Sequence, residues 1–226
     1  MFFAYCTDVK RIFSFNPMFT VRRPKREQKP PTFYDIELVQ RVVKWQPDET
    51  RRAFFALVYG TGADISPALV VMRDDIDAVR HEVRIPGTKT GARDRIVRVA
   101  DWAWPIFWKH AKLMLPLARV FPSTWNRWTV ADWHRQTVGD GVKDTHGKLE
   151  RRGLELPLRL PARYARHHFA VRLLRAGTPV EIVAAALGSS KDVVMKYYGN
   201  FIPTGADRAK WERKAAAADR QRRKAK

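Results

Sequence analysis

The spacing of apolar residues changes twice along this chain, and these changes constrain the fold more than any other feature of the sequence. Helical spacing predicts helices over residues 36–45, 49–60, 66–72 and 102–120. Between residues 74 and 101 the period falls to two, with Val83 and Ile85 supplying β-branched residues in one expected strand and Ile96, Val97 and Val99 in the next. The sequence therefore predicts a mainly α fold with a small antiparallel β-sheet, of the α+β class.

Three short helices are expected near the C-terminal end of the sequence. Their ranges are 163–175, 179–188 and 191–201, with Pro179 at the first helical position of the middle helix. Thr178, Pro179 and Glu181 have the pattern of a capping box at the start of the middle helix, and Gly188 ends it. Two helices joined by a tight turn containing glycine are also typical of a helix-turn-helix, so a DNA-binding regulator stays open as one interpretation.

Composition divides the chain into three parts. Residues 1–31 combine an expected amphipathic helix over residues 1–15 with a basic, proline-rich linker. Residues 32–202 form the main domain, and residues 203–226 form a basic tail or helix. Within the main domain, residues 123–138 are expected to form a helix and residues 139–160 a surface loop.

The chain carries a large excess of positive charge. Its 226 residues include 43 Lys and Arg against 23 Asp and Glu, a formal net charge of +20. This excess favours a polyanionic partner, and nucleic acid is a better match than an anionic membrane surface. One cysteine, Cys6, excludes an internal disulfide and a cysteine-based zinc site, and fits a reducing, cytoplasmic or nucleoid setting.

Five segments in order resemble a known family. They are TGADISPALVVMRDDID, GTKTGARDRIVRV, ARHHFAVRLLRAG, IVAAALGSS and MKYYGNF. Their order and spacing resemble the catalytic domain of the tyrosine recombinases, or phage integrases, across residues 32–202. The resemblance implies that domain's fold, and DNA cleavage in which a tyrosine attacks a phosphodiester and becomes a 3′-phosphotyrosine. It further implies double-stranded DNA as the partner, a homo-oligomeric, tetrameric synapse on DNA, and no metal or other cofactor. For residues 1–31 it implies the last helix of a preceding core-binding domain.

The resemblance assigns catalytic roles residue by residue. Arg166 falls on the second motif arginine and Lys89 on the lysine of the β-hairpin, whose tip is expected over residues 87–91. Tyr198, nine residues after Ser189, falls on the nucleophile. Tyr197 is the alternative, and the plainer interpretation of Tyr198 is a core aromatic. In such a site guanidinium groups clamp the phosphate, and the lysine protonates the leaving oxygen.

Three motif positions hold another residue type. Asp64 stands where the family has its first motif arginine. Arg163 stands where the family has a histidine three residues before the second motif arginine, and Ser189 stands where it has a histidine or tryptophan. Asp64 is interpreted either as a substitution that impairs or slows catalysis in an inherited site, or as a surface helix cap. Arg163, one helical turn before Arg166, either supplies a second guanidinium or contacts the DNA backbone. It cannot shuttle a proton, because arginine stays charged.

The expected DNA contacts are Arg163, Lys89, Arg93 and Lys191. His167 is expected to make a structural hydrogen bond. The predicted function is that of a site-specific recombinase or integrase of a phage or mobile element. A non-catalytic DNA-binding protein that keeps the fold is the alternative. A helix-turn-helix regulator is disfavoured, because it explains neither the hairpin lysine nor the spacing from Ser189 to Tyr198.

Overall fold

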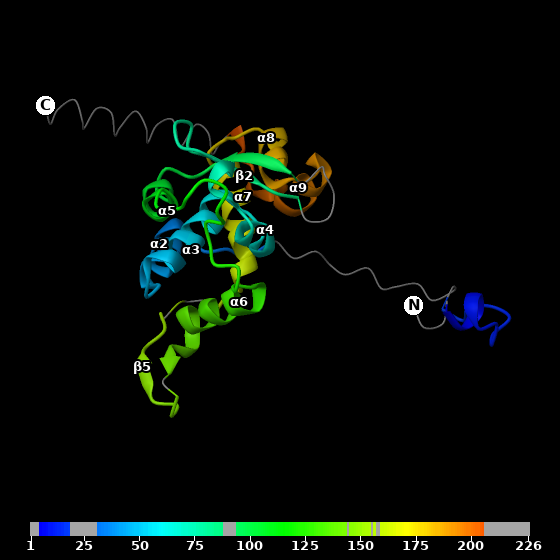
Figure 1. The fold of residues 1–226 in the computed structure, drawn as a ribbon. Coiled ribbons are helices and arrows are strands. Elements are labelled where there is room, and N and C mark those ends of the chain that lie inside the picture. The colour runs from blue at the N-terminus through cyan, green and yellow to red at the C-terminus, as the bar shows by residue number, and fades with distance from the viewer. Residues whose placement is uncertain are drawn as a thin grey trace, which may run out of the picture.

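A central helix organises the fold seen in the computed structural model, which describes residues 5–18, 31–87, 94–143, 145–154, 156 and 159–205. This helix is α3 (Glu49–Thr61), and it contacts α2 (Ile36–Trp45), α5 (Trp104–Ala111) and α7 (Ala165–Arg175). The small sheet lies beside these helices (Figure 1). The predicted mainly α fold with a small antiparallel sheet is confirmed.

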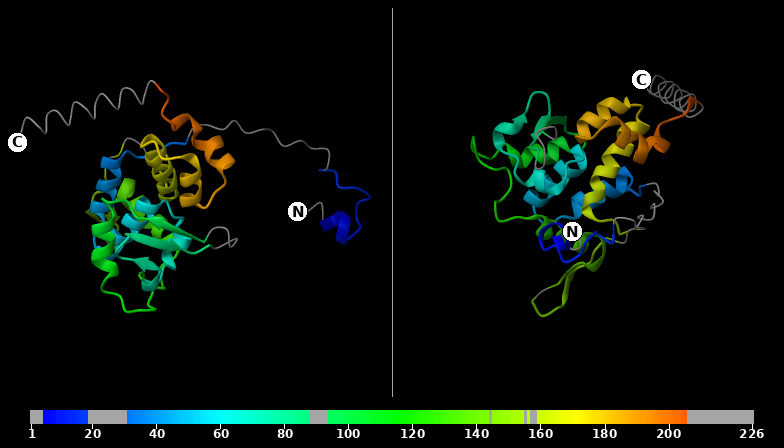
Figure 2. Two further views of the ribbon diagram at one scale, coloured as in Figure 1. Left: turned by 90° about the horizontal axis from the view of Figure 1, so that it is seen from above. Right: turned by 90° about the vertical axis from the view of Figure 1, so that its right-hand side faces the viewer.

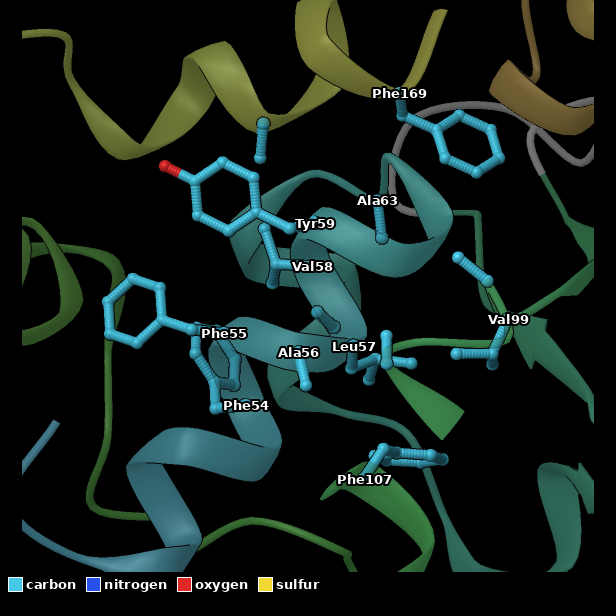
Figure 3. Packing of buried hydrophobic residues seen from close by; sticks show 14 of the residues in the cluster. Phe54, Phe55, Ala56, Leu57, Val58, Tyr59, Ala63, Val99, Phe107 and Phe169 are labelled. Carbon is cyan, nitrogen blue, oxygen red and sulfur yellow. The ribbon is translucent and has the colours of Figure 1, made fainter. Parts of the chain in front are cut away.

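Helix α3 is buried along most of its length. The Asp48 side chain caps it by accepting a hydrogen bond from the Arg51 backbone, and every residue from 53 to 61 is buried. Figure 3 shows its side chains directed toward several neighbouring elements, among them Phe107 of α5 and Phe169 of α7. Such a helix has to lie at the centre of a core, because it has no polar face after its first turn.

The sheet is three-stranded and antiparallel, in the order β1 (Ile76–Asp77), β2 (Glu82–Ile85), β3 (Arg95–Arg98). Val83 pairs with Val97 across β2 and β3, and both are buried. Ile96, the neighbour of Val97 on β3, points outward and is 67% exposed. The alternation expected from the sequence is therefore confirmed, while the hairpin tip beyond Gly87 lies outside the described residues.

The Trp-rich segment forms a shorter helix than expected. Trp104 and Phe107 of α5 are buried, which confirms their interpretation as core residues. The helix ends at Ala111 instead of continuing to residue 120. Leu113 and Leu115 beyond it are exposed, and the backbone of Leu117 has a positive φ of 61°, which is incompatible with a continuing helix.

The expected surface loop over residues 139–160 is wrong in part. Helix α6 (Arg127–Arg135) continues as a π-helical turn over Gln136–Asp140 and is followed by a short antiparallel hairpin. Its strands are β4 (Val142–Lys143) and β5 (Leu149–Arg151), and they extend away from the helical body in Figure 1. Strands of two and three residues are too short to show an alternating pattern in the sequence.

The three C-terminal helices are α7, α8 (Val180–Leu187) and α9 (Lys191–Tyr198), which pack together in both views of Figure 2. Ser190 caps α9, but the expected capping box of α8 is not formed. Pro179 occupies the N-cap position of α8, and the Glu181 carboxylate pairs instead with Lys191, Oε1 to Nζ, at 2.5 Å.

The helix expected over residues 1–15 is also wrong. Within the part of this segment that the structure describes, only Tyr5–Val9 is helical, as a single π-helical turn. Val9 and Ile12 are exposed, so these side chains of the expected apolar face are not buried by packing in the described part of the chain. A short helix without such packing is marginal in water. Most of the linker and of the tail, residues 19–30 and 206–226, lies outside the described residues.

Candidate active site

A tight turn at the end of α3 brings two of the motif segments together. Gly62 ends α3 with a φ of +64°, a conformation that glycine adopts without strain. A Cβ atom at this position would lie 2.6 Å from Cδ1 of Phe169 on α7. Only glycine therefore allows the turn to approach α7 this closely, and the approach places Asp64 beside the first turn of α7.

Asp64 faces Arg166. Its Oδ2 atom lies 3.7 Å from Nη1 of Arg166, with 49% of the Asp64 side chain and 23% of the Arg166 side chain exposed. Asp64 is the N-cap residue of α4 (Ile65–Leu69) by position, as one interpretation expected, but its side chain does not cap the helix by a hydrogen bond. Its carboxylate occupies space next to the guanidinium that the resemblance assigns to the phosphate.

Tyr198 contacts His167, the residue that follows Arg166 on α7. The Tyr198 hydroxyl lies 2.7 Å from Nδ1 of His167. Tyr198 is 5% exposed and its ring belongs to the core, whereas Tyr197 is 43% exposed. The hydrogen bond expected for His167 is present, but its partner is the hydroxyl that the resemblance assigns to the nucleophile.

The surroundings keep Tyr198 protonated and His167 neutral near pH 7. Burial raises the pKa of the Tyr198 hydroxyl to about 12, against a smaller lowering by the Arg166 charge and a raising by Asp64. Burial also lowers the pKa of His167, and the guanidinium charges of Arg166 and Arg163 lower it further. A neutral imidazole and a protonated phenol thus share one hydrogen bond.

The remaining described residues predicted for the site make other contacts. Arg163 lies in a 3₁₀ turn just before α7, is exposed, and stands over the Tyr164 ring with 5.7 Å to its centroid. Ser189 lies in the turn between α8 and α9, where its backbone N–H donates to the Ala184 carbonyl at 2.9 Å. Lys191 is exposed at the start of α9, where it pairs with Glu181.

Lys89 and Arg93 lie outside the described residues. The residues of β2 and β3 that flank this segment make defined contacts. Arg95 Nε donates to the Ala186 carbonyl at 2.7 Å, which ties β3 to the last turn of α8. Arg84 Nη2 and Asp94 Oδ2, from either side of this segment, lie 2.6 Å apart. The hairpin therefore starts from the side of the sheet that contacts the C-terminal helices.

Two structural contacts of this site were missed by the sequence analysis. The pairing of Asp64 with Arg166 and the contact of His167 with Tyr198 both join residues far apart in the chain. The spacing that identifies each motif carries no information about which side chains of two motifs meet. For His167, the signal that could have been used is its position directly after Arg166 on the same helix.

Two further statements apply to the described part of the chain alone. Within it, no group of three or more His, Cys, Asp or Glu side chains is arranged to hold a metal ion. Among the helices described, none is long and apolar enough to cross a membrane.

Comparisons with known proteins give relatives in sequence and in fold. No protein-family model matches the chain. A tyrosine recombinase of Thermosipho africanus is 27% identical over 198 residues, covering 83% of this chain and 63% of the relative. The tyrosine recombinase XerD of Corynebacterium glutamicum is 31% identical over 150 residues, covering 65% of this chain and 47% of the relative. The chain spans about half to two thirds of the length of the curated relatives it matches.

Solved structures share the fold. The catalytic domain of bacteriophage HP1 integrase aligns with a TM-score of 0.54 at 16% identity, over 79% of this chain and 93% of that domain. The Tn1549 transposon integrase, solved with a circular intermediate DNA, aligns with a TM-score of 0.63 at 16% identity, over 94% of this chain and 75% of that one. The chain is therefore similar in sequence to tyrosine recombinases and shares the fold of tyrosine recombinase (integrase) catalytic domains.

Proposed function

We propose that this chain is the catalytic part of a site-specific recombinase or integrase that cleaves and rejoins duplex DNA through Tyr198. The observation that carries the proposal is the convergence of α7 and α9, where the Tyr198 hydroxyl contacts His167 beside Arg166. The family relationship and the net charge of +20 support it.

Tyr198, Arg166, Lys89 and Arg163 have the following roles in the proposed reaction. The Tyr198 oxygen attacks phosphorus, the bond to the 5′ oxygen breaks, and a 3′-phosphotyrosine forms. Arg166 binds the non-bridging oxygens in the transition state, supported by the positive end of α7, whose first turn it occupies. Lys89 protonates the leaving 5′ oxygen. Arg163 adds a second guanidinium or contacts the DNA backbone.

DNA binding is proposed to rest on phosphate contacts. Arg163, Lys89, Arg93 and Lys191 are the proposed contacts, and for Lys191 this requires exchange of Glu181 for a phosphate. We further propose assembly of several copies on DNA, and a cytoplasmic location associated with the nucleoid.

One observation favours a second candidate function. The Asp64 carboxylate stands 3.7 Å from the guanidinium that has to bind phosphate, and it repels any phosphate that approaches. A DNA-binding protein that keeps the recombinase fold without strand cleavage would tolerate this residue. The two candidates differ in whether a covalent adduct with DNA forms.

The test is incubation with nicked suicide duplexes of randomised central sequence, followed by a denaturing gel for protein–DNA adducts. The proposed function predicts an adduct that disappears in Tyr198→Phe, with DNA affinity nearly unchanged because only one hydroxyl is removed. Tyr197→Phe is the matched control and should retain the adduct. Binding of duplex DNA without any adduct would favour the non-catalytic candidate.

A further inference from the structure

If Tyr198 attacks DNA as proposed above, its hydroxyl must lose a proton while the bond to phosphorus forms. Burial raises the pKa of this hydroxyl to about 12. Near pH 7 only about one molecule in 10⁵ therefore carries the ionised phenolate. A proton acceptor in contact with the hydroxyl relieves this limit, and general-base catalysis of this kind contributes ~10²–10⁴-fold.

The described side chains around Tyr198 offer few acceptors. Arg163 holds the position of a motif histidine but has no lone pair to accept a proton. The Asp64 carboxylate faces Arg166, and its recorded ion pair is with that guanidinium. His167 Nδ1 lies 2.7 Å from the Tyr198 oxygen, within direct proton-transfer distance.

We propose that His167 is the proton acceptor for Tyr198 in strand cleavage, a role that Arg163 cannot fill. The neutral imidazole carries its proton on Nε2 and presents the Nδ1 lone pair to the hydroxyl. As the Tyr198 oxygen bonds to phosphorus, its proton moves to Nδ1 and leaves an imidazolium. In the rejoining step the free 5′ hydroxyl attacks the phosphotyrosine and gives its proton back to Lys89, the bond from phosphorus to the Tyr198 oxygen breaks, and His167 returns its proton to that oxygen.

The charges around His167 couple this transfer to the presence of DNA. Arg166 on α7 and Arg163 in the preceding 3₁₀ turn disfavour an imidazolium, so His167 stays neutral in the free protein. The Tyr164 ring meets His167 edge-on with 5.0 Å between centroids, and Asp64 acts on the hydroxyl from the start of α4. An arriving phosphate places negative charge beside both guanidiniums and thereby favours the protonated imidazole.

The test distinguishes removal of the proton from the Tyr198 hydroxyl from protonation of the leaving 5′ oxygen. The probe is a nicked duplex of randomised flanking sequence with one sulfur atom in place of the bridging 5′ oxygen at the cleavage position. A thiolate leaves without being protonated, so this probe recovers the activity of a variant that lacks the acid, such as Lys89→Ala. His167→Asn should lower the rate of adduct formation by ~10²–10⁴-fold with the oxygen and the sulfur probe alike.

The pH dependence gives a second readout. The wild-type rate should be level from neutral pH upward, because His167 is already neutral there. The His167→Asn rate should instead rise tenfold per pH unit toward the pKa of Tyr198. His146→Asn, an exposed histidine between β4 and β5, is the matched control and should behave as wild type.

The outcomes distinguish this inference from the proposed function. No adduct with the wild-type protein on either probe overturns the proposed function itself. A wild-type adduct together with an unchanged rate in His167→Asn overturns only the inference. A loss that the sulfur probe recovers, or a slower rate with the wild-type pH profile, also overturns it, because His167 would then act on the leaving oxygen or only position Tyr198. If His167→Asn does not fold, as judged by its thermal melt, His167→Gln takes its place under the same criteria.

Discussion

Replacing Asp64 should strengthen DNA binding, because its carboxylate competes with DNA for Arg166. The two charged groups are 3.7 Å apart. Coulomb attraction at that distance is about 1 kcal/mol in water and about 4.5 kcal/mol at an effective dielectric constant near 20. With 49% of the Asp64 side chain exposed, solvent screening places the pair near the lower value.

The change in DNA affinity follows from two electrostatic contributions of about this size. In Asp64→Asn the phosphate no longer has to displace a carboxylate from Arg166, and it is no longer repelled by one. Together these contributions give about 1–2 kcal/mol, or about 5- to 30-fold tighter binding of duplex DNA. The gain should shrink as salt is added, because the pair is partly exposed. Asp132→Asn is the matched control: it removes the same charge from an exposed pair with Arg135 on α6.

Asp64→Arg should also raise cleavage. It adds a second guanidinium next to Arg166, and one well-placed donor is worth ~10²–10³ in rate. The extended backbone at Asp64 accepts any residue, and no capping hydrogen bond is lost. Filter binding, adduct gels and thermal melts on the wild-type protein and the three variants measure these effects. Equal DNA affinity in Asp64→Asn and Asp132→Asn, or lower melting temperatures with unchanged DNA behaviour, would refute the reasoning.

Three other predictions concern binding and stability. Affinity for duplex DNA should fall linearly with salt on logarithmic axes, because phosphate contacts release counterions; a flat response in a binding titration would contradict a DNA-binding role. Gly62→Ala should lower the free energy of unfolding by about 1–3 kcal/mol in denaturant titrations, because it strains a positive φ and drives a methyl group into Phe169; an unchanged midpoint would contradict the close approach. Burial lowers the pKa of His134 from 6.5 to about 4, and its Nε2 lies 2.9 Å from the Tyr59 hydroxyl. Because the unfolded chain takes up the proton first, stability should be complete above pH 6.5 and fall by up to about 3 kcal/mol toward pH 4. The double variant Tyr59→Phe with His134→Leu should lose this part of the pH dependence in thermal melts, and an unaltered slope would assign it to other groups.

The sequence was sufficient to predict the helices and strands whose buried residues recur at a regular spacing. Helix α2 occupies residues 36–45 as expected, because Val39, Val42 and Val43 mark one buried face. The sheet was found from its alternation in the same way. The two tyrosines were separated by spacing alone, and the structure buries Tyr198 while exposing Tyr197, although their chemical roles remain predictions.

Features that depend on long-range contacts escaped the sequence analysis. The capping box at α8 was locally plausible, yet Glu181 pairs with Lys191 of the next helix instead. The aromatic and aliphatic residues of the N-terminal segment predicted a helix, but an apolar face needs a partner surface to stabilise it. The partners of Asp64 and His167 depend on how α3, α7 and α9 pack, which no local pattern encodes.

Mapping the DNA attachment point tests the central claim most directly. Wild-type protein is incubated with the nicked duplex pool, the covalent fraction is digested with protease and nuclease, and the modified peptide is sequenced by mass spectrometry. The account predicts a nucleotide 3′-phosphate on the oxygen of Tyr198, in the peptide that contains KYYGNF. Attachment at Tyr197 or at another residue, or DNA binding with no modified peptide, would contradict the assignment of Tyr198 as the nucleophile.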